Sequence, residues 1–176
     1  MTLKTQGQLV EAAQNGDLES FGCLYEKYYA PMTALAYSVL RDRHLAEDAA
    51  QQSFVIACDN LAKLKSKDKF APWLAAICRN TARQMNRTRA KTTALYDEQT
   101  ADKQNTNGEA IRQAVWQLRP FDREPIVLRY YDNMTYDRIA ELLGISKQAV
   151  HGRLTRAKRK IKKKLKQNGF RSYDHE

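Results

Sequence analysis

The last third of the chain constrains the fold most, because its apolar residues recur at helical spacing on both sides of one glycine, Gly144. Thr135 and Ser146 stand where helix N-caps belong, since a short hydroxyl side chain can accept a hydrogen bond from the first turn. Gly144 can adopt the left-handed conformation that ends a helix. The pattern predicts helices over about 135–143 and 146–166 that cross steeply as a helix-turn-helix. The apolar positions are Ile139, Ala140, Leu142 and Leu143 before the turn, and Val150, Leu154, Ala157, Ile161 and Leu165 after it.

The second of these helices is expected to present hydrogen-bond donors on its outward face. Arginine, lysine and glutamine side chains are of the kind that read base edges and phosphates in the major groove of DNA. An ordinary helical hairpin followed by a basic exit helix is the alternative interpretation. The residues predicted to contact DNA are Ser146, Lys147, Gln148, His151, Arg153 and Arg156.

The net charge of +10 is unevenly distributed along the chain. Residues 63–91 carry nine basic side chains and one acidic, and residues 147–166 carry ten basic side chains and no acid. Residues 1–62 instead carry four basic and eight acidic side chains, and residues 92–110 carry one basic and four acidic. Like charges four residues apart on a helix repel, so a solvated helix face alone does not account for so many cations. The pattern favours a nucleic acid bound at two surfaces.

Helical spacing also extends through the first half of the chain. It predicts helices over about 5–15, 18–40 and 44–64, with a kink or a helix junction at Pro31. The lysine-rich segment 63–69 has no apolar period and is predicted to be an exposed loop. These elements and the helix-turn-helix together predict an all-α protein.

The next helix is expected to begin near Pro72, because a proline in the first turn costs no hydrogen bond. Its predicted inward residues are Trp73, Ile77 and Ala76, and its predicted outward residues are Arg79, Asn80, Arg83, Gln84 and Arg87. Residues 92–108 are polar and aperiodic, which marks a linker between two domains. Helices over about 109–118 and 121–131 are expected to follow it.

Composition excludes several classes of protein. No apolar run approaches the ~18 residues of a membrane span, and the N-terminus has no apolar segment of a secretory signal. The three histidines do not pair with cysteines at metal-ligand spacing, and no phosphate-binding loop or hydrolase motif is present, so no metal or cofactor is expected. Cys58 and Cys78 are expected on apolar helix faces, and all three cysteines, Cys23 included, as free thiols of a reducing cytoplasm.

Four blocks of sequence resemble, in order, an extracytoplasmic-function sigma factor of bacterial RNA polymerase across nearly all of residues 8–166. The block beginning at Asp17 looks like the first helix of the family's sigma-2 domain, and the block beginning at Ala46 is similar to the region that binds the polymerase clamp. The block beginning at Phe70 looks like the helix that leads into recognition of the −10 element. The segment from Leu118 through the helix-turn-helix resembles the sigma-4 domain.

The resemblance implies two small helical domains, a sigma-2-like helical bundle and a sigma-4-like helix-turn-helix, joined by a flexible linker. It implies a transcription initiation factor that binds the β′ clamp helices and the β flap of core RNA polymerase, recognises and melts the −10 element, reads the −35 element and catalyses no reaction. An anti-sigma protein is the expected regulator, and the bacterial cytoplasm, or the membrane through that partner, the expected location. The implied boundaries are 1–92 for sigma-2, 93–108 for the linker, 109–168 for sigma-4 and 169–176 for the tail.

The resemblance also implies which residues meet the polymerase and the −10 element. The acidic start of the third helix would bind the clamp, and the lysine loop would hold a base extruded from the non-template strand, which costs a few kcal/mol of unstacking. The clamp set is Glu47, Asp48, Gln51 and Phe54. The −10 set is Lys63, Lys65, Lys67, Lys69, Arg79, Asn80, Arg83 and Arg87.

The main alternative is a helix-turn-helix regulator that acts without polymerase. A dimeric repressor of that kind would need an unused apolar stripe for a second copy, and the sequence predicts none. A nuclease would need a carboxylate or metal cluster, which the sequence also lacks. Membrane binding by the C-terminal amphipathic helix is disfavoured because its apolar stripe has no aromatic anchors.

Overall fold

The computed structural model describes residues 4–93 and 107–167, and most of the predicted linker and the whole predicted tail lie outside these residues. The described part consists of helices and connecting turns without a strand, which confirms the all-α prediction. The first half contains α1 (Gln6–Gln14), α2 (Leu18–Leu40), α3 (Arg43–Asn60), the 3₁₀ turns η1 (Leu61–Lys63) and η2 (Lys67–Lys69), and α4 (Phe70–Thr93). The second half contains α5 (Asn107–Trp116), α6 (Pro120–Tyr130), α7 (Tyr136–Leu143) and α8 (Lys147–Gln167).

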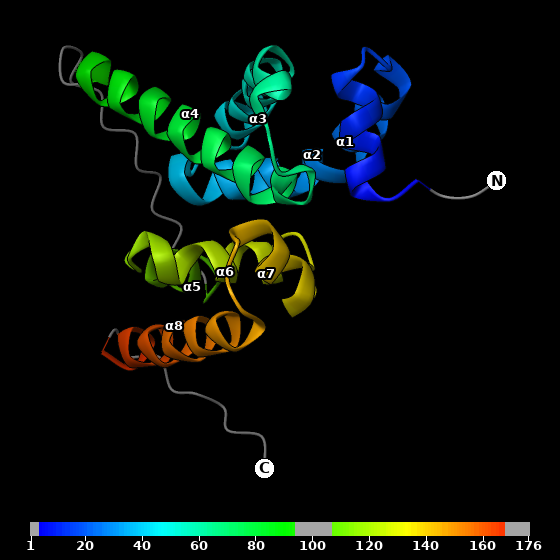
Figure 1. The fold of residues 1–176 in the computed structure, drawn as a ribbon. Helices are drawn as coiled ribbons and strands as arrows, with labels where there is room; N and C mark the ends of the chain where they lie inside the picture. The colour runs from blue at the N-terminus through cyan, green and yellow to red at the C-terminus, as the bar shows by residue number, and fades with distance from the viewer. Residues whose placement is uncertain (1–3, 94–106, 168–176) are drawn as a thin grey trace.

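The helix α2 forms the centre of the N-terminal half, because it packs against α1, α3 and α4 (Figure 1). Leu24, Met32 and Leu35 from α2 are fully buried and belong to the same core cluster as Phe70 of α4. No helix junction occurs at Pro31, where a kink or a junction was predicted, since α2 continues across the proline to Leu40. Burial of apolar side chains on both sides of the proline stabilises the helix through it.

The buried face of α4 differs from the predicted one. Ala76 is exposed, and Trp73 and Ile77 are only partly buried. The helix packs against α2 and α3 and, on another side, against α7, so its contacts are not confined to one apolar stripe. The side chains that enter the core are Phe70, Ala71, Leu74, Ala75, Cys78 and Ala82.

In the C-terminal half, α6 lies between α2 and α8, with α5 and α7 beside it (Figure 1). The apolar positions predicted for the helix-turn-helix supply its core, including Ile139, Leu142, Val150 and Leu154. Gly144 ends α7 with φ of 65°, and its turn lies so close to α4 that a Cβ added there would stand 3.2 Å from the Cβ of Pro72. The helix-turn-helix therefore touches the N-terminal bundle at its own turn.

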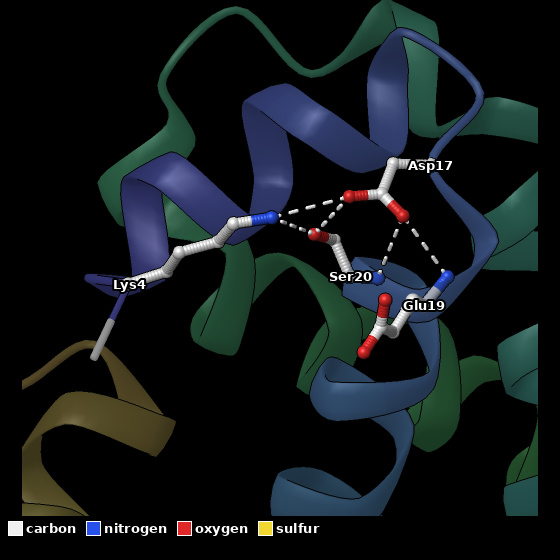
Figure 2. A network of polar contacts seen from close by, with 4 residues as sticks. All are labelled: Lys4, Asp17, Glu19 and Ser20. Carbon is white, nitrogen blue, oxygen red and sulfur yellow. Dashed lines mark hydrogen bonds and ion pairs between the residues drawn. The ribbon is translucent and has the colours of Figure 1, made fainter. Parts of the chain in front are cut away.

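The start of α2 is held by the carboxylate of Asp17, shown in Figure 2. Its Oδ1 accepts hydrogen bonds from the backbone N–H groups of Glu19 and Ser20 at 3.1 and 3.2 Å. Its Oδ2 accepts from the Ser20 hydroxyl at 2.6 Å and from Lys4 Nζ at 3.2 Å. These bonds, the Ser20 hydroxyl first, lower the pKa of Asp17 from its ordinary 3.8 to about 2. The ionised carboxylate thus caps α2 and ties the segment before α1 to it.

We expect Asp17→Ala to lower the melting temperature by about 2–4 °C, because the first turn of α2 loses its cap. The folded-state pKa lies below the ordinary 3.8, so the ionised carboxylate stabilises the fold above about pH 4 and this contribution disappears as the pH falls toward 2. Thermal melts at pH 2, 4 and 7 check this, with Glu19→Ala as the control. A difference between wild type and Asp17→Ala that stays constant from pH 7 to pH 2 would contradict the assignment.

Candidate nucleic-acid interface

The helix α8, like α7 before it, begins at a hydroxyl cap. The Thr135 side chain accepts a hydrogen bond from the Arg138 backbone N–H at 3.3 Å, which starts α7. The Ser146 hydroxyl accepts from the Ala149 backbone N–H at 3.1 Å, which starts α8. Between the two helices, the backbone N–H of Ile145 donates to the carbonyl of Ala140 at 3.0 Å. The caps and the turn that the sequence predicts are the ones that fix the geometry of this motif.

The predicted DNA-contacting residues of this motif lie together at the start of α8. Arg153 is the partial exception, because the residue is partly buried and its guanidinium carbon lies 5.6 Å from the ring centroid of Phe121 in α6. Lys147 Nζ lies 2.9 Å from a carboxylate oxygen of Asp137, so a DNA phosphate would compete with that surface ion pair. The exposed members of the set are Ser146, Lys147, Gln148, His151 and Arg156.

A buried carboxylate, that of Asp122 in α6, forms ion pairs with cations of α8. Its side chain is 2% exposed, and its oxygens lie 2.5 Å from Lys160 Nζ, 3.8 Å from Arg156 Nε and 3.9 Å from an Arg119 guanidinium nitrogen. The cation of Arg156 is therefore oriented from within the protein while half of its side chain stays accessible. Asp122 is not among the residues predicted from the sequence, although an acid that precedes a helix rich in cations was the available signal.

The second basic surface combines the segment 61–69 with the outer face of α4. The loop predicted over 63–69 contains the 3₁₀ turn η2 and follows η1, which occupies the end of the predicted third helix, and the buried Leu61 and Leu64 attach the segment to the core. Lys67 forms an ion pair with Glu11 of α1. The remaining predicted cations and polar groups that are exposed here are Lys63, Lys65, Lys69, Asn80, Arg83 and Arg87.

Arg79 does not lie with this outward set. Its Nε donates a hydrogen bond to Glu124 Oε1 of α6 at 3.1 Å, and the two side chains are 18% and 5% exposed. The prediction of an outward Arg79 is therefore wrong for this structure, because α6 packs over this part of the N-terminal bundle. The ion pair joins the two halves of the chain.

The acidic face of α3 carries the predicted clamp-binding set, with one correction. Asp48 and Gln51 are exposed, and Glu47 is partly exposed and lies 3.1 Å from Arg43 Nε. Phe54, in contrast, is 3% exposed, and its ring packs 4.7 Å from that of Tyr25, measured between centroids. Phe54 is therefore a core residue, because its position on the helix faces α2. The exposed apolar residue of this surface is the next one along the chain, Val55.

The cysteines differ from one another in their environment. Cys78 is buried as predicted, and burial raises the pKa of its thiol to about 12, so the thiol remains protonated at neutral pH. Cys58 is exposed, so its predicted place on an apolar face is wrong, and Cys23 is exposed as well. Within residues 4–93 and 107–167, no cluster of three metal-ligating side chains occurs, and no helix is long and apolar enough to cross a membrane.

Comparison with known families agrees with this arrangement. The family model for sigma-70 region 2 matches residues 24–92, and the model for sigma-70 region 4 matches residues 108–161. The first match contains the acidic face of α3 and the second basic surface, and the second match contains the helix-turn-helix. The chain is an extracytoplasmic-function sigma factor of the sigma-70 family. It therefore belongs to the transcription initiation factors that direct RNA polymerase to promoters.

Individual relatives span this sigma factor nearly from end to end. The protein named "Probable RNA polymerase sigma factor RfaY" of Xanthomonas campestris is 30% identical over 88% of the chain, which spans only 42% of that relative's length. RNA polymerase sigma factor YlaC of Bacillus subtilis is 28% identical over 84% of the chain and 92% of its own. The solved structure of CnrH, in complex with the cytosolic domain of CnrY, matches with a TM-score of 0.64 and 27% identity over 92% of this chain and 97% of that one.

Proposed function

We propose that this sigma factor binds core polymerase through α3, binds the −10 element through residues 61–69 and α4, and reads the −35 element through α8. The observation that carries the proposal is that two exposed basic surfaces lie on the two parts of the chain that match sigma-70 regions 2 and 4. The proposed domains are residues 1–92 and 109–168, joined by a linker over 93–108 and followed by a tail over 169–176.

At the −10 element, exposed lysines of the segment 61–69 would receive the displaced strand. Lys63, Lys65 and Lys69 offer cations to phosphates, and the segment's two turns give them a fixed backbone. Asn80 and Arg83, with Arg87 one turn further along α4, would contact bases and backbone as the duplex opens. Phosphate contacts of this kind give affinity, and contacts to an extruded base give selectivity.

At the −35 element, the first half of α8 would enter the major groove. Lys147, Gln148 and His151 are exposed over its first turns, and donors of these types bond the edges of guanine and adenine. Arg156 is held by Asp122 at the far end of this surface, where it would meet a phosphate. The ten cations between residues 147 and 166 would make binding strongly dependent on salt.

Toward the polymerase, the proposed docking residues are Glu47, Asp48 and Gln51, which bind the β′ clamp helices, while the C-terminal domain approaches the β flap. Two of the eight acidic side chains of residues 1–62 lie in this set, so docking gives part of that negative charge a role that DNA binding does not. We further propose that the protein performs no catalysis and that it works in the cytoplasm. Because the solved relative CnrH is bound to the cytosolic domain of CnrY, a protein anti-sigma factor is the proposed regulator of this chain too.

Gel filtration with bacterial core RNA polymerase tests the proposal. The wild-type protein is expected to co-elute with the polymerase, and the double variant Asp48→Lys, Gln51→Lys is expected to elute apart, since the docking face changes sign. The matched control makes the same change of charge in the C-terminal half, with Glu109→Lys in α5 and Gln117→Lys directly after it, and should still co-elute. Separate elution of the wild-type protein at moderate salt would overturn the proposal.

A further inference from the structure

The first helix, α1, precedes the residues that the region 2 family model matches and has no role in the function proposed above. It packs along both 3₁₀ turns of the segment 61–69. Val10 of α1 is fully buried in the core, so α1 is a fixed part of the bundle. Its polar side chains can therefore set the shape of that segment.

One end of the segment is fixed by the side-chain amide of Gln14, the last residue of α1. Its Nε2 donates hydrogen bonds to the carbonyls of Leu61 and Leu64, each at 2.9 Å. The same Leu61 carbonyl accepts the Leu64 backbone N–H at 3.0 Å, which closes η1. Both amide hydrogens of one side chain are thus used to hold the backbone on either side of Lys63.

The other end of the segment meets the first residues of α1. The side-chain nitrogen of Gln6 donates to the Asp68 carbonyl at 3.3 Å. Gly7 permits this approach, because a Cβ there would stand 3.3 Å from the Asp68 carboxylate. One turn further along, Glu11 forms the ion pair with Lys67. An acid of α1 thereby neutralises one cation of the segment and leaves the lysines on either side exposed.

We propose that α1 positions the segment 61–69 for the −10 strand and sets its charge, with Gln14 fixing the backbone and Glu11 restraining Lys67. The inference rests on the proposed function, in which this segment receives the −10 element. It predicts different defects from two substitutions on one helix. Replacing Gln14 should lower the selectivity among −10 bases, because the backbone that carries the lysines loses two hydrogen bonds. Loss of the Glu11 charge should strengthen binding to any single strand, because Lys67 becomes available to a phosphate.

The first test measures base selection by the assembled holoenzyme. Wild-type protein and Gln14→Ala are each mixed with core polymerase and a DNA pool randomised through both promoter elements, and the DNA in heparin-resistant complexes is sequenced. Gln14→Ala should lower the enrichment of preferred −10 bases about fivefold to tenfold and leave the enrichment of −35 bases unchanged. Gln117→Ala, an exposed glutamine of the C-terminal half, serves as control and should behave as wild type.

The outcomes separate this inference from the function on which it rests. A wild-type holoenzyme that selects no −10 bases would overturn the proposed function and this inference with it. A wild-type holoenzyme that selects them, with Gln14→Ala selecting them equally well, would overturn only the role of α1. Equal loss of −10 and −35 selection in Gln14→Ala would also overturn it, because general destabilisation would then explain the effect.

The second test measures the charge contributed by Lys67. The affinity of the free protein for a 20-residue oligo-dT strand is measured between 50 and 300 mM salt. Glu11→Gln should steepen the slope of log affinity against log salt concentration by about 0.7, the value for one additional phosphate contact on a single strand. Adding Lys67→Ala to that variant should return the slope to no more than the wild-type value. An unchanged slope in Glu11→Gln would overturn the proposed restraint of Lys67.

Discussion

Phe54→Ala is expected to destabilise the protein by about 3–5 kcal/mol, the cost of removing a buried aromatic ring and leaving a cavity. The ring packs against Tyr25 and, edge to face, against Phe21 with 6.5 Å between centroids. It therefore holds α3 onto α2. The measurement is equilibrium unfolding in urea, followed by circular dichroism.

Phe54→Ala should also weaken binding to core polymerase, but only because the face formed by α3 loses its support. Val55→Ser makes the matched comparison, because its side chain is 61% exposed beside that face. It should change the free energy of unfolding by no more than about 0.5 kcal/mol. It should still weaken polymerase binding, by about tenfold, since it lies one turn beyond Gln51 on the surface proposed to dock.

Two results would contradict this division of roles. If Phe54→Ala unfolded at the wild-type urea concentration and yet lost polymerase binding, the ring would contact the polymerase directly. If Val55→Ser bound polymerase with wild-type affinity, the docking face would not extend to this turn of α3. Because both variants are assayed for folding and for binding, neither result can be mistaken for the other.

The helices and their ends could be predicted because they depend on interactions between residues close together in the sequence. The Thr135 and Ser146 caps and the left-handed Gly144 occur as expected, because each depends only on residues a few positions away. The apolar repeat of α8 identified its buried face for the same reason. The predicted helix bounds in the C-terminal half consequently differ from the observed ones by only one or two residues.

The predicted exposure of a single residue was wrong where a contact between segments distant in the sequence determines it. Phe54 is a different case, because it follows the helical spacing of the buried Ala46, Ala50 and Ala57, and only the family resemblance placed it in the clamp set. Arg79 follows the outward spacing of Arg83 and Arg87, but α6 covers it and supplies Glu124. Periodicity defines a face of a helix, whereas partners 45 residues away along the chain depend on how the two halves pack.

Glu124→Gln is expected to lower the free energy of unfolding by about 2–3 kcal/mol. The substitution keeps the volume of the side chain but removes the charge that pairs with Arg79, and a mostly buried guanidinium without a counter-charge is costly. The value lies below the full cost for a deeply buried pair because 18% of the Arg79 side chain reaches solvent. The measurement is again urea unfolding, at pH 7.

A double-mutant cycle separates the ion pair from the packing around it. Arg79→Met fills similar space without charge, and the pair Arg79→Met, Glu124→Gln should recover much of the stability that Glu124→Gln alone loses. A coupling free energy of about 1.5–3 kcal/mol is expected between the two positions. Additive effects would contradict a direct interaction. The control Arg43→Met breaks the exposed pair with Glu47 and should leave the urea midpoint close to that of the wild-type protein.

The same pair has a consequence for DNA, because Arg79 is in the set that the sequence predicts to bind the −10 element, although the proposed set of exposed residues does not include it. While Glu124 holds it, the guanidinium cannot contact a phosphate, so α6 competes with DNA for this side chain. Glu124→Gln should therefore raise the affinity of the free protein for oligo-dT about threefold to tenfold while lowering its stability. Weaker or unchanged binding by Glu124→Gln would show that Arg79 serves only to join α4 to α6. A gain that disappears when Arg79→Met is added would assign the effect to Arg79 itself.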